Sequence, residues 1–307
     1  MRLGDVGQRV FTALGSVIFV ITLAFFMLNI LPGNAVRNTL LAAGASEALI
    51  AERERQLGLD RPLLEHYADY FSGVLRGDLG VSFVDRIPVV EKITLRLGST
   101  IELAISAIVI GVLTSQGFTW GCFLAPVSIR WLFRRLVDLM QSLPLFLTAP
   151  LASYIIAAQL HLLPATGQGT LRHLILPATM LGIHMGALIA REQISMMTAQ
   201  LEQPYVTSAY ARGLNDRLIF FRHIWRVTLP QTLIFIGLQF GFLLSGVAIT
   251  EVIFARSGLG QLIISSIISQ DYPVVLGIII WSVVIYTLIE MILNGVVVYL
   301  DPRLRHV

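Results

Sequence analysis

Six stretches of about 20 or more mostly apolar residues follow one another along the chain. A helix of about 20 such residues crosses the hydrocarbon core of a bilayer, where no water is present to bond an exposed backbone. The stretches cover residues 10–31, 99–124, 136–160, 171–194, 231–254 and 273–300. We therefore predict an all-α membrane protein with about six transmembrane helices.

The composition indicates lipid as the main surroundings of this chain. Of the 307 residues, 55% are hydrophobic and 13% are charged, whereas soluble domains carry roughly 25% charged residues. The net charge is only +3, and the arginines form separated clusters instead of one basic stripe, which argues against a nucleic-acid partner. The single cysteine, Cys122, excludes an internal disulfide and is expected to be buried.

Basic residues in the short connections set the predicted orientation. Arg2 and Arg9 precede the first stretch, which lacks a cleavage motif of small residues and is therefore predicted to be a retained span. Because cytoplasmic connections are enriched in Arg and Lys, both termini are predicted to be cytoplasmic. The other basic residues used here are Arg130, Arg134, Arg135, the arginines from Arg191 to Arg226, Arg303 and Arg305.

This orientation divides the chain into four parts. We predict an N-terminal transmembrane helix at 1–33, an external segment at 34–97, a core of five transmembrane helices at 98–300 and a cytoplasmic tail at 301–307. Within the external segment, Pro62 precedes apolar residues at helical spacing, among them Leu63, Tyr67 and Phe71. They predict an amphipathic helix against the outer surface, with a plain connecting helix as the alternative.

The sequence contains no recognisable catalytic motif. Its only lysine, Lys92, follows Glu91, so it cannot complete a phosphate-binding loop, and any ATP must be bound by another chain. The motifs of membrane proteases are missing, and none of the six histidines begins a zinc-binding pair. We therefore predict no catalytic residue, no metal site and no enzyme activity in this chain.

Ionisable residues inside the apolar stretches are candidates for the transport path, since a charge in hydrocarbon is costly unless it faces a cavity or a partner. Glu251 and Glu290 are such residues, with pairing between helices as a second interpretation. Glu102 and Glu251 lie near the ends of stretches, so they could also simply reach the interface. His184 could offer a ligand to a passing metal, but a lone histidine in a membrane more often bonds a neighbouring helix.

The connection between the fourth and fifth stretches is the most informative segment. Pro204 suits the first turn of a helix, and Val206, Ala209, Tyr210 and Gly213 share one face at helical spacing. Gly213 then allows a sharp turn before a second helix at 217–225, which leads into Leu229-Pro230 and the fifth span. The segment is either an ordinary connecting loop or a docking helix for a cytoplasmic partner.

At this connection the sequence resembles the permease subunits of ATP-binding-cassette importers, in the peptide, opine and nickel branch. The resemblance assigns ATPase coupling to the positions that match the family's Glu-Ala-Ala loop. These positions are Tyr205, Val206, Ala209, Tyr210, Arg212, Gly213, Leu214 and Asp216.

Other landmarks of the family occur in order along almost the whole chain. They are Leu31-Pro32-Gly33, Leu57-Gly58-Leu59-Asp60-Arg61-Pro62-Leu63, Arg76-Gly77-Asp78-Leu79-Gly80-Val81-Ser82, Arg172-His173-Leu174-Ile175-Leu176-Pro177, Glu251-Val252-Ile253-Phe254-Ala255, Gly258-Leu259-Gly260, Asp271-Tyr272-Pro273-Val274 and Asp301-Pro302-Arg303. The sequence departs from the family at Thr207-Ser208, where Glu-Ala often stands, and over 116–150.

The resemblance implies a multi-pass subunit of a bacterial inner membrane. Its expected partners are a sister permease chain, two cytoplasmic ATPase subunits that hold ATP and Mg²⁺, and an external solute-binding protein, with the coupling helix between spans four and five. The expected solute is a dipeptide or oligopeptide, nickel, or an opine or metal chelate. The alternative is a secondary transporter or channel subunit that works without an ATPase.

Overall fold

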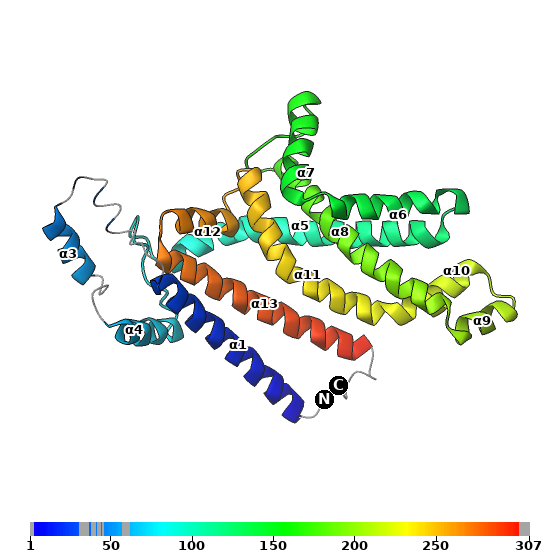
Figure 1. Cartoon of the computed structure of the whole chain (residues 1–307), viewed down its shortest axis with the longest axis horizontal. Helices are drawn as coiled ribbons and strands as arrows, with labels where there is room; N and C mark the ends of the chain where they lie inside the picture. The colour runs from blue at the N-terminus through cyan, green and yellow to red at the C-terminus, as the bar shows by residue number, and fades with distance from the viewer. Residues whose placement is uncertain are drawn as a thin grey trace. The chain divides into compact units, whose positions relative to one another are not determined.

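The computed structural model describes residues 3–30, 37, 41, 44, 46–56 and 62–300, and these are almost entirely helical (Figure 1). Outside the described residues lie the predicted end of the first span at Pro32-Gly33, most of the 57–63 landmark and the tail at 301–307. The helices are α1 (Leu3–Ile30), α3 (Glu47–Gln56), α4 (Leu63–Leu75), α5 (Val89–Leu124), α6 (Val127–Ser142), α7 (Leu145–Ala152), the π-helix η1 (Ser153–Gln159), α8 (Leu171–Leu201), α9 (Pro204–Ala211), α10 (Asp216–Ile219), the π-helix η2 (Phe220–Trp225), α11 (Arg226–Ile253), α12 (Leu259–Ile268) and α13 (Tyr272–Leu300).

The helices pack as two compact units. One unit combines the described part of 1–98 with Gly258–Thr287, and the other combines Ser99–Ser257 with the described residues from Leu288 onward. The four parts predicted from the sequence describe the position of each segment relative to the membrane, not its packing. They stay a prediction.

Among the residues that the structure describes, four helical segments are long and apolar enough to cross a membrane: α5, α8, the continuous helix Asp216–Ile253 and the Tyr272–Leu293 part of α13. The pair formed by α6 and Leu145–Gln159 raises the number to five if it counts as one bent span. In α1, the stretch Leu14–Leu28 is apolar but shorter. The prediction of a helical membrane protein is confirmed at this level.

The predicted third span, 136–160, is divided by a sharp bend. The chain bends by 103° between Ser142 and Leu145, because Leu143 precedes Pro144 and adopts an extended conformation (φ −99°, ψ 119°). A residue before proline is disfavoured in the helical region, and proline itself has no N–H for the preceding turn. The predicted loop around Arg130 and Arg134 is likewise helical, as part of α6.

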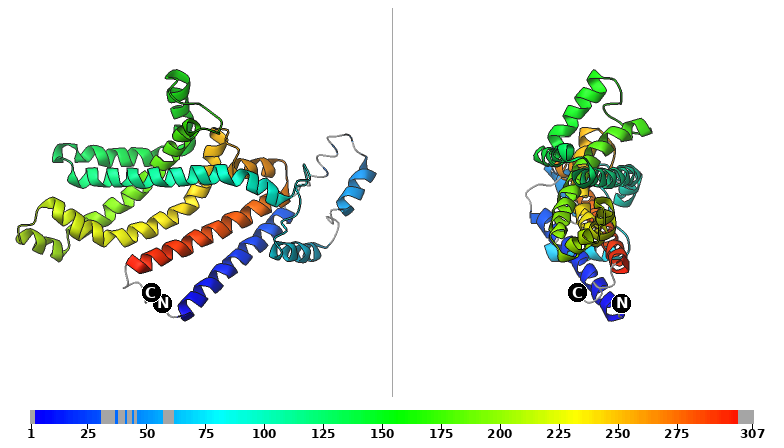
Figure 2. Two further views of the ribbon diagram at one scale, coloured as in Figure 1. Left: turned by 180° about the vertical axis from the view of Figure 1, so that it is seen from behind. Right: turned by 90° about the vertical axis from the view of Figure 1, so that its right-hand side faces the viewer.

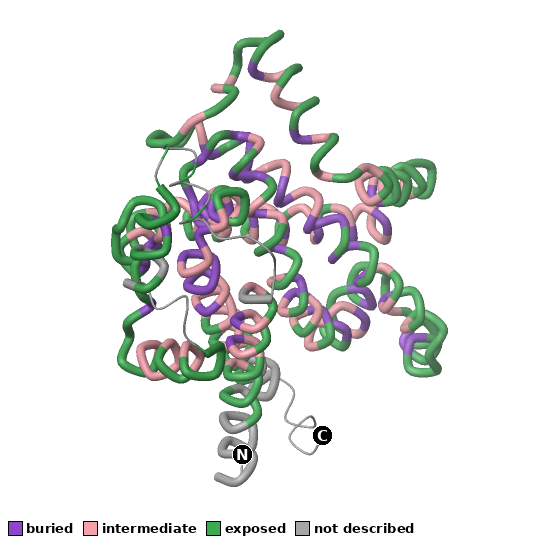
Figure 3. The backbone as a smooth tube through the Cα atoms, turned by 60° about the vertical axis from the view of Figure 1, so that its left-hand side comes forward, coloured by how far each residue is buried: buried purple, intermediate pink, exposed green. Residues whose placement is uncertain are grey.

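Helix α8 forms the core of the second unit. In its most apolar window 61% of the residues are buried, against 22–28% in the other three long segments. Buried and exposed residues alternate along many of the helices in Figure 3. Helix α8 crosses α5 closely through glycines: a Cβ at Gly182 would lie 2.8 Å from the Ala107 carbonyl oxygen, and one at Gly186 would lie 2.7 Å from that of Gly111. Such close backbone approach through small residues is typical of helix pairs in membranes.

In the first unit, α4 lies beside α1 (Figure 2), and its aromatic residues contact α1. The ring of Phe25 lies 5.3 Å from the rings of both Tyr67 and Tyr70, measured between centroids. The hydroxyls of Thr22 and Tyr67 are 2.7 Å apart and hydrogen-bonded. The amphipathic helix predicted after Pro62 is therefore present, and its aromatic side contacts another helix of the chain.

Candidate functional site

The short helix α9 is the centre of the candidate coupling segment. Gln203 precedes it in an extended conformation, and Pro204 occupies its first turn, where the missing proline N–H costs no hydrogen bond. At the other end, Gly213 has a φ of +77°. Its N–H bonds the Tyr210 carbonyl at 2.9 Å, and that of Leu214 bonds the Ala209 carbonyl at 3.3 Å. This pair of bonds is the Schellman motif, which requires a left-handed residue at the glycine position.

One face of α9 is buried and the other is exposed. Val206 and Ala209 are buried in a cluster with Met197 of α8 and with Ile219, Phe220 and Ile224. Tyr210, which helical spacing places on the same face, is 47% exposed. The reason is the packing of α9 on α8 and η2, which buries a narrower stripe than helical spacing alone suggests. The outward residues are Tyr205, Thr207, Ser208, Tyr210, Ala211 and Arg212.

The two tyrosines of α9 are held by polar contacts. The Tyr205 hydroxyl donates to Gln200 Oε1 at 2.8 Å, and partial burial raises its pKa. Burial also raises the pKa of Tyr210, and the neighbouring Asp216 carboxylate adds to this effect. Both phenols therefore stay protonated at neutral pH and keep the hydroxyl as a donor.

After Gly213 the chain enters one continuous helix. Asn215 caps it by accepting a hydrogen bond from the Leu218 N–H at 2.8 Å, and Asp216 in the first turn is favourably placed near the helix N-terminus. The helix then runs through η2 into α11 as far as Ile253. The helix predicted at 217–225 is therefore present, as the first part of this continuous helix, and Pro230 lies inside the helix without ending it.

A network of buried and part-buried polar groups joins this segment to the spans, and it was not predicted from the sequence. Trp225 Nε1 donates to Gln116 Oε1 at 3.1 Å. The Gln116 amide donates to Gln193 Oε1 at 3.1 Å, which also accepts from the Thr119 hydroxyl at 3.2 Å. Gln193 is fully buried. Glutamine in an apolar run is the signal that could have indicated a bond between helices.

His184 bonds neighbouring backbone and helix groups. Its Nδ1 lies 2.9 Å from the Met180 carbonyl oxygen, and its Nε2 lies 3.1 Å from both Thr148 Oγ1 on α7 and the Leu143 carbonyl oxygen at the bend. The interpretation that the histidine bonds a neighbouring helix is therefore confirmed. Among the described residues there is no group of three or more His, Cys, Asp or Glu side chains placed to hold a metal ion.

His184 also lines a cavity of about 230 Å³ beside the bend between α6 and α7. The walls are mostly apolar, with Leu181, Met185, Phe242 and Leu243 among them, and Gln141 and Gln239 supply amide groups. Such a cavity has room for water or a small ligand group.

Glu251 is fully buried at the end of α11, and Thr100 of α5 donates a hydrogen bond to its Oε1 at 2.6 Å. This bond is the pairing between helices that was the second interpretation of Glu251. Close by, the buried Arg256 donates to Glu102 Oε2 at 2.9 Å and to Ser99 Oγ at 3.3 Å. These bonds tie the end of α11 and the residues that follow it to the part of α5 that belongs to the second unit. The contact of Arg256 was not predicted from the sequence.

Glu290 has different surroundings, on an exposed side of α13. The three predicted path residues therefore occupy three different environments: a bend contact for His184, a buried bond to α5 for Glu251, and an exposed helix face for Glu290. Cys122 is buried as expected.

Comparison with known proteins gives one consistent result. Residues 107–306 match the family described as "Binding-protein-dependent transport system inner membrane component". The chain is 31% identical over 303 residues to the glutathione transport system permease protein GsiC of Escherichia coli, with 97% of this chain and 98% of that protein covered. The protein of the same name in Salmonella typhimurium is 32% identical over 303 residues, with the same coverage.

A solved structure supports the fold. The crystal structure of an amino acid ABC transporter with histidines matches with a TM-score of 0.51 at 15% identity, covering 76% of this chain and 98% of that one. Together with the helices long enough to span a membrane, these matches make the chain a multi-pass inner-membrane protein. It is a non-catalytic transport component, and it belongs to the family of binding-protein-dependent transport system inner membrane components, the permease subunits of ATP-binding-cassette importers.

Proposed function

We propose that this permease pairs with a sister permease chain and two cytoplasmic ATPase subunits, which bind ATP and Mg²⁺, and that it imports a peptide-like solute delivered by an external binding protein. Helix α9 is the coupling helix that the ATPase moves. The observation that carries this proposal is the geometry of α9, which is capped at Gly213, packed on α8 and η2 by Val206 and Ala209, and exposed on its opposite face.

The proposed topology has six spans. They are α1, α5, the bent pair of α6 and Leu145–Gln159, α8, Asp216–Ile253 and α13. An even number of spans brings both termini to one side, and the arginines of α6 and of the α9 connection mark that side as cytoplasmic. The segment at 34–97 and the turn between α12 and α13 are then external and meet the loaded binding protein.

The exposed face of α9 suits a docking role because it combines two aromatic rings with a positive charge. Tyr205 and Tyr210 are 38% and 47% exposed, and Arg212 is exposed at the end of the helix. Tyrosine and arginine are enriched where proteins bind one another. Thr207 and Ser208 keep this face free of the acidic residue common in the family, so Tyr205, Tyr210 and Arg212 supply its main contacts.

For the solute, a small peptide is the preferred class, and glutathione is the first compound to test. This preference rests on the printed names of relatives that are 30–32% identical over almost their whole length. The absence of a three-residue ligand cluster from the described residues gives no reason to prefer free nickel. Uptake of glutathione, a dipeptide and Ni²⁺ by the reconstituted complex distinguishes the three.

The coupling assignment is tested with Gly213→Asp. At a φ of +77° a side chain is strained, so α9 should lose its fixed end. The variant should still assemble, but ATP hydrolysis should continue with strongly reduced solute uptake. Gly169→Asp is the matched control, since Gly169 also has a positive φ, 104°, and lies in a loop with open space around its Cβ position. Normal uptake by Gly213→Asp, or failure of ATPase chains to co-purify with the wild type, would contradict the proposal.

A further inference from the structure

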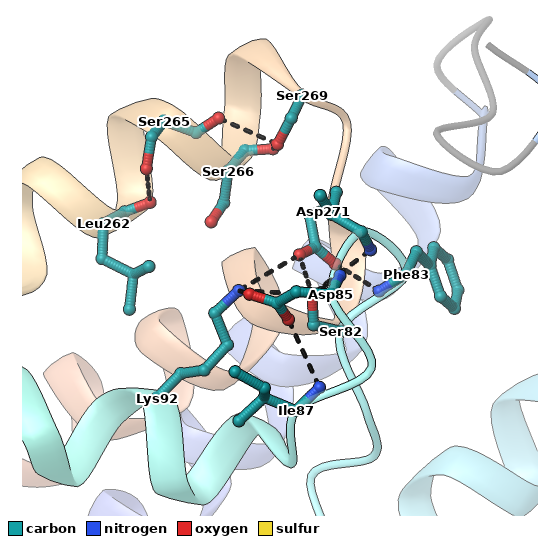
Figure 4. Close-up of polar contacts among 11 residues, drawn as sticks. Ser82, Phe83, Asp85, Ile87, Lys92, Leu262, Ser265, Ser266, Ser269 and Asp271 are labelled. Atoms are coloured by element: carbon teal, nitrogen blue, oxygen red, sulfur yellow. Dashed lines mark hydrogen bonds and ion pairs between the residues drawn. The ribbon is translucent and has the colours of Figure 1, made fainter. Parts of the chain in front are cut away.

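A loop before α5 is fastened to the corner between α12 and α13 by a single buried aspartate (Figure 4). Asp271 Oδ2 accepts a hydrogen bond from the Ser82 hydroxyl at 2.5 Å, and Oδ1 accepts one from the Phe83 N–H at 2.9 Å. The Lys92 ammonium lies 3.8 Å from the same carboxylate. All of these residues belong to the first unit.

The position of Asp271 makes these bonds informative. It directly precedes α13, where an aspartate commonly caps its own helix. Here both carboxylate oxygens are instead engaged by a loop almost 190 residues away in the sequence, and the residue is 1% exposed. A buried carboxylate is costly unless it is fully bonded. Asp271 therefore specifies the position of the loop on the corner.

The loop is also ordered internally. The Ser82 N–H bonds the Ile87 carbonyl at 3.0 Å, and the N–H groups of Val84 and Asp85 point to Ser82 Oγ at 3.3 Å. Lys92 donates to Asp85 Oδ2 at 2.7 Å. Burial works to raise the pKa of Asp85, but the hydrogen bonds that its carboxylate accepts from Lys92 and from the Ile87 N–H, together with the Lys92 charge, lower the pKa, so Asp85 is a carboxylate at neutral pH.

The opposite side of the loop is exposed and partly apolar. Val81, Val84 and Ile87 are 37–46% exposed, and Asp85 and Arg86 are exposed beside them. Apolar side chains over a fixed backbone, with charges around them, are suited to contact another protein at low entropic cost.

We propose that Asp271 is a positioning residue for the import cycle, which holds the 81–88 loop in the conformation that contacts the loaded solute-binding protein. The inference rests on the proposed function, since it requires the loop to be external. Without the two bonds to Asp271 the loop would have to be ordered when the binding protein docks. Ordering even one residue's backbone in that step corresponds to roughly a tenfold weaker association.

The test uses the complete complex in liposomes and the binding protein that stimulates ATP hydrolysis by the wild type. The ATPase rate is measured as a function of binding-protein concentration for wild type, Asp271→Ala, Asp271→Asn, Ser82→Ala and Ser269→Ala. Ser269 is the matched control, because its hydroxyl bonds only carbonyls of its own helix, at 2.9 Å and 3.4 Å. It lies two residues before Asp271.

Asp271→Ala should raise the half-maximal concentration by about tenfold, while the rate at saturating binding protein stays close to that of the wild type. Asp271→Asn should restore most of the affinity, because an amide can still accept from Phe83 and donate to Ser82. Ser82→Ala should shift the concentration in the same direction by a smaller factor, and Ser269→Ala should not shift it.

An unchanged half-maximal concentration in Asp271→Ala, or a lower maximal rate without that change, overturns the inference. If Asp271→Ala does not assemble, Ser82→Ala decides in the same way. A wild-type complex that no binding protein stimulates overturns the proposed function together with this inference, whereas a stimulated wild type with unaffected variants overturns the inference alone.

Discussion

The crossing of α5 and α8 gives the sharpest prediction about stability. In α8, a Cβ placed on Gly186 would lie 2.1 Å from Thr114 Oγ1 and 2.7 Å from the Gly111 carbonyl oxygen. The threonine hydroxyl can rotate away, but the carbonyl belongs to the backbone of α5 and cannot. Gly186→Ala therefore forces the two helices apart by several tenths of an ångström, since an ordinary contact needs about 3.4 Å.

The magnitude follows from a matched pair of variants. Gly117→Ala places its Cβ in a position with nothing within 4 Å, so it shows only the gain from replacing glycine in a helix, about 1 kcal/mol. Gly186→Ala has the same gain but adds the cost of overpacking, about 1–3 kcal/mol. The difference in the free energy of unfolding between the variants is therefore the overpacking cost alone.

The assay is thermal unfolding of the purified chain in detergent, followed by tryptophan fluorescence. Gly186→Ala should have a Tm several degrees below that of Gly117→Ala, given roughly 2 °C per kcal/mol for a chain of this size. Equal Tm values for the two variants, or a higher value for Gly186→Ala, would refute the close glycine-mediated crossing of α5 and α8.

Three further predictions concern polar contacts. Glu102→Gln should lower the free energy of unfolding by about 2 kcal/mol, because it weakens the charged bond to the buried Arg256. The control Glu91→Gln, in the exposed first turn of α5, should change the free energy of unfolding little. Chemical denaturation measures both variants. Trp225→Phe should lower the free energy of unfolding by about 1 kcal/mol, because it removes the bond to Gln116, and it should reduce solute uptake per ATP hydrolysed. The control Trp131→Phe, at an exposed position, should change neither quantity. The pKa of Asp85 is lowered in the folded chain, so its contribution to stability is present above the ordinary aspartate pKa and is lost as the pH falls through the lowered value. A spin label at Ile87→Cys in a Cys122→Ala background should therefore become more mobile in that pH range. Asp85→Asn should abolish this pH dependence.

Much of the helical framework could be predicted because membrane spans have a simple physical cause. Apolar length alone located the cores of α5, α8, α11 and α13, and Pro204 and Gly213 located α9 and its end. The bend at Pro144 was missed because the apolar run continues across it. Hydropathy indicates burial in lipid but does not indicate the direction of the backbone. Pro144 inside the apolar run was a feature of the sequence that indicated a bend.

The polar contacts could not be predicted because they join residues far apart in the chain. Thr100 with Glu251, and Trp225 with Gln116, are pairs separated by more than 100 residues. Single glutamines and threonines in apolar runs indicate that a partner exists, but the choice of partner depends on how the helices cross. For the same reason the predicted path residues His184, Glu251 and Glu290 could be named, while their separate environments could not.

If α9 is the coupling helix, the contacts around it explain how its movement can shift several spans together. Helix α9 is fixed to α8 and η2 by the buried cluster around Val206 and Met197, and Trp225 connects η2 to the amides of Gln116 and Gln193 on α5 and α8. The glycine crossing then prevents α5 and α8 from sliding past each other. A displacement of α9 is therefore transmitted to a packed body, as rigid-body transitions require. The bend at Leu143-Pro144 is one break of the helix hydrogen bonding in this unit, and a change of angle there costs little.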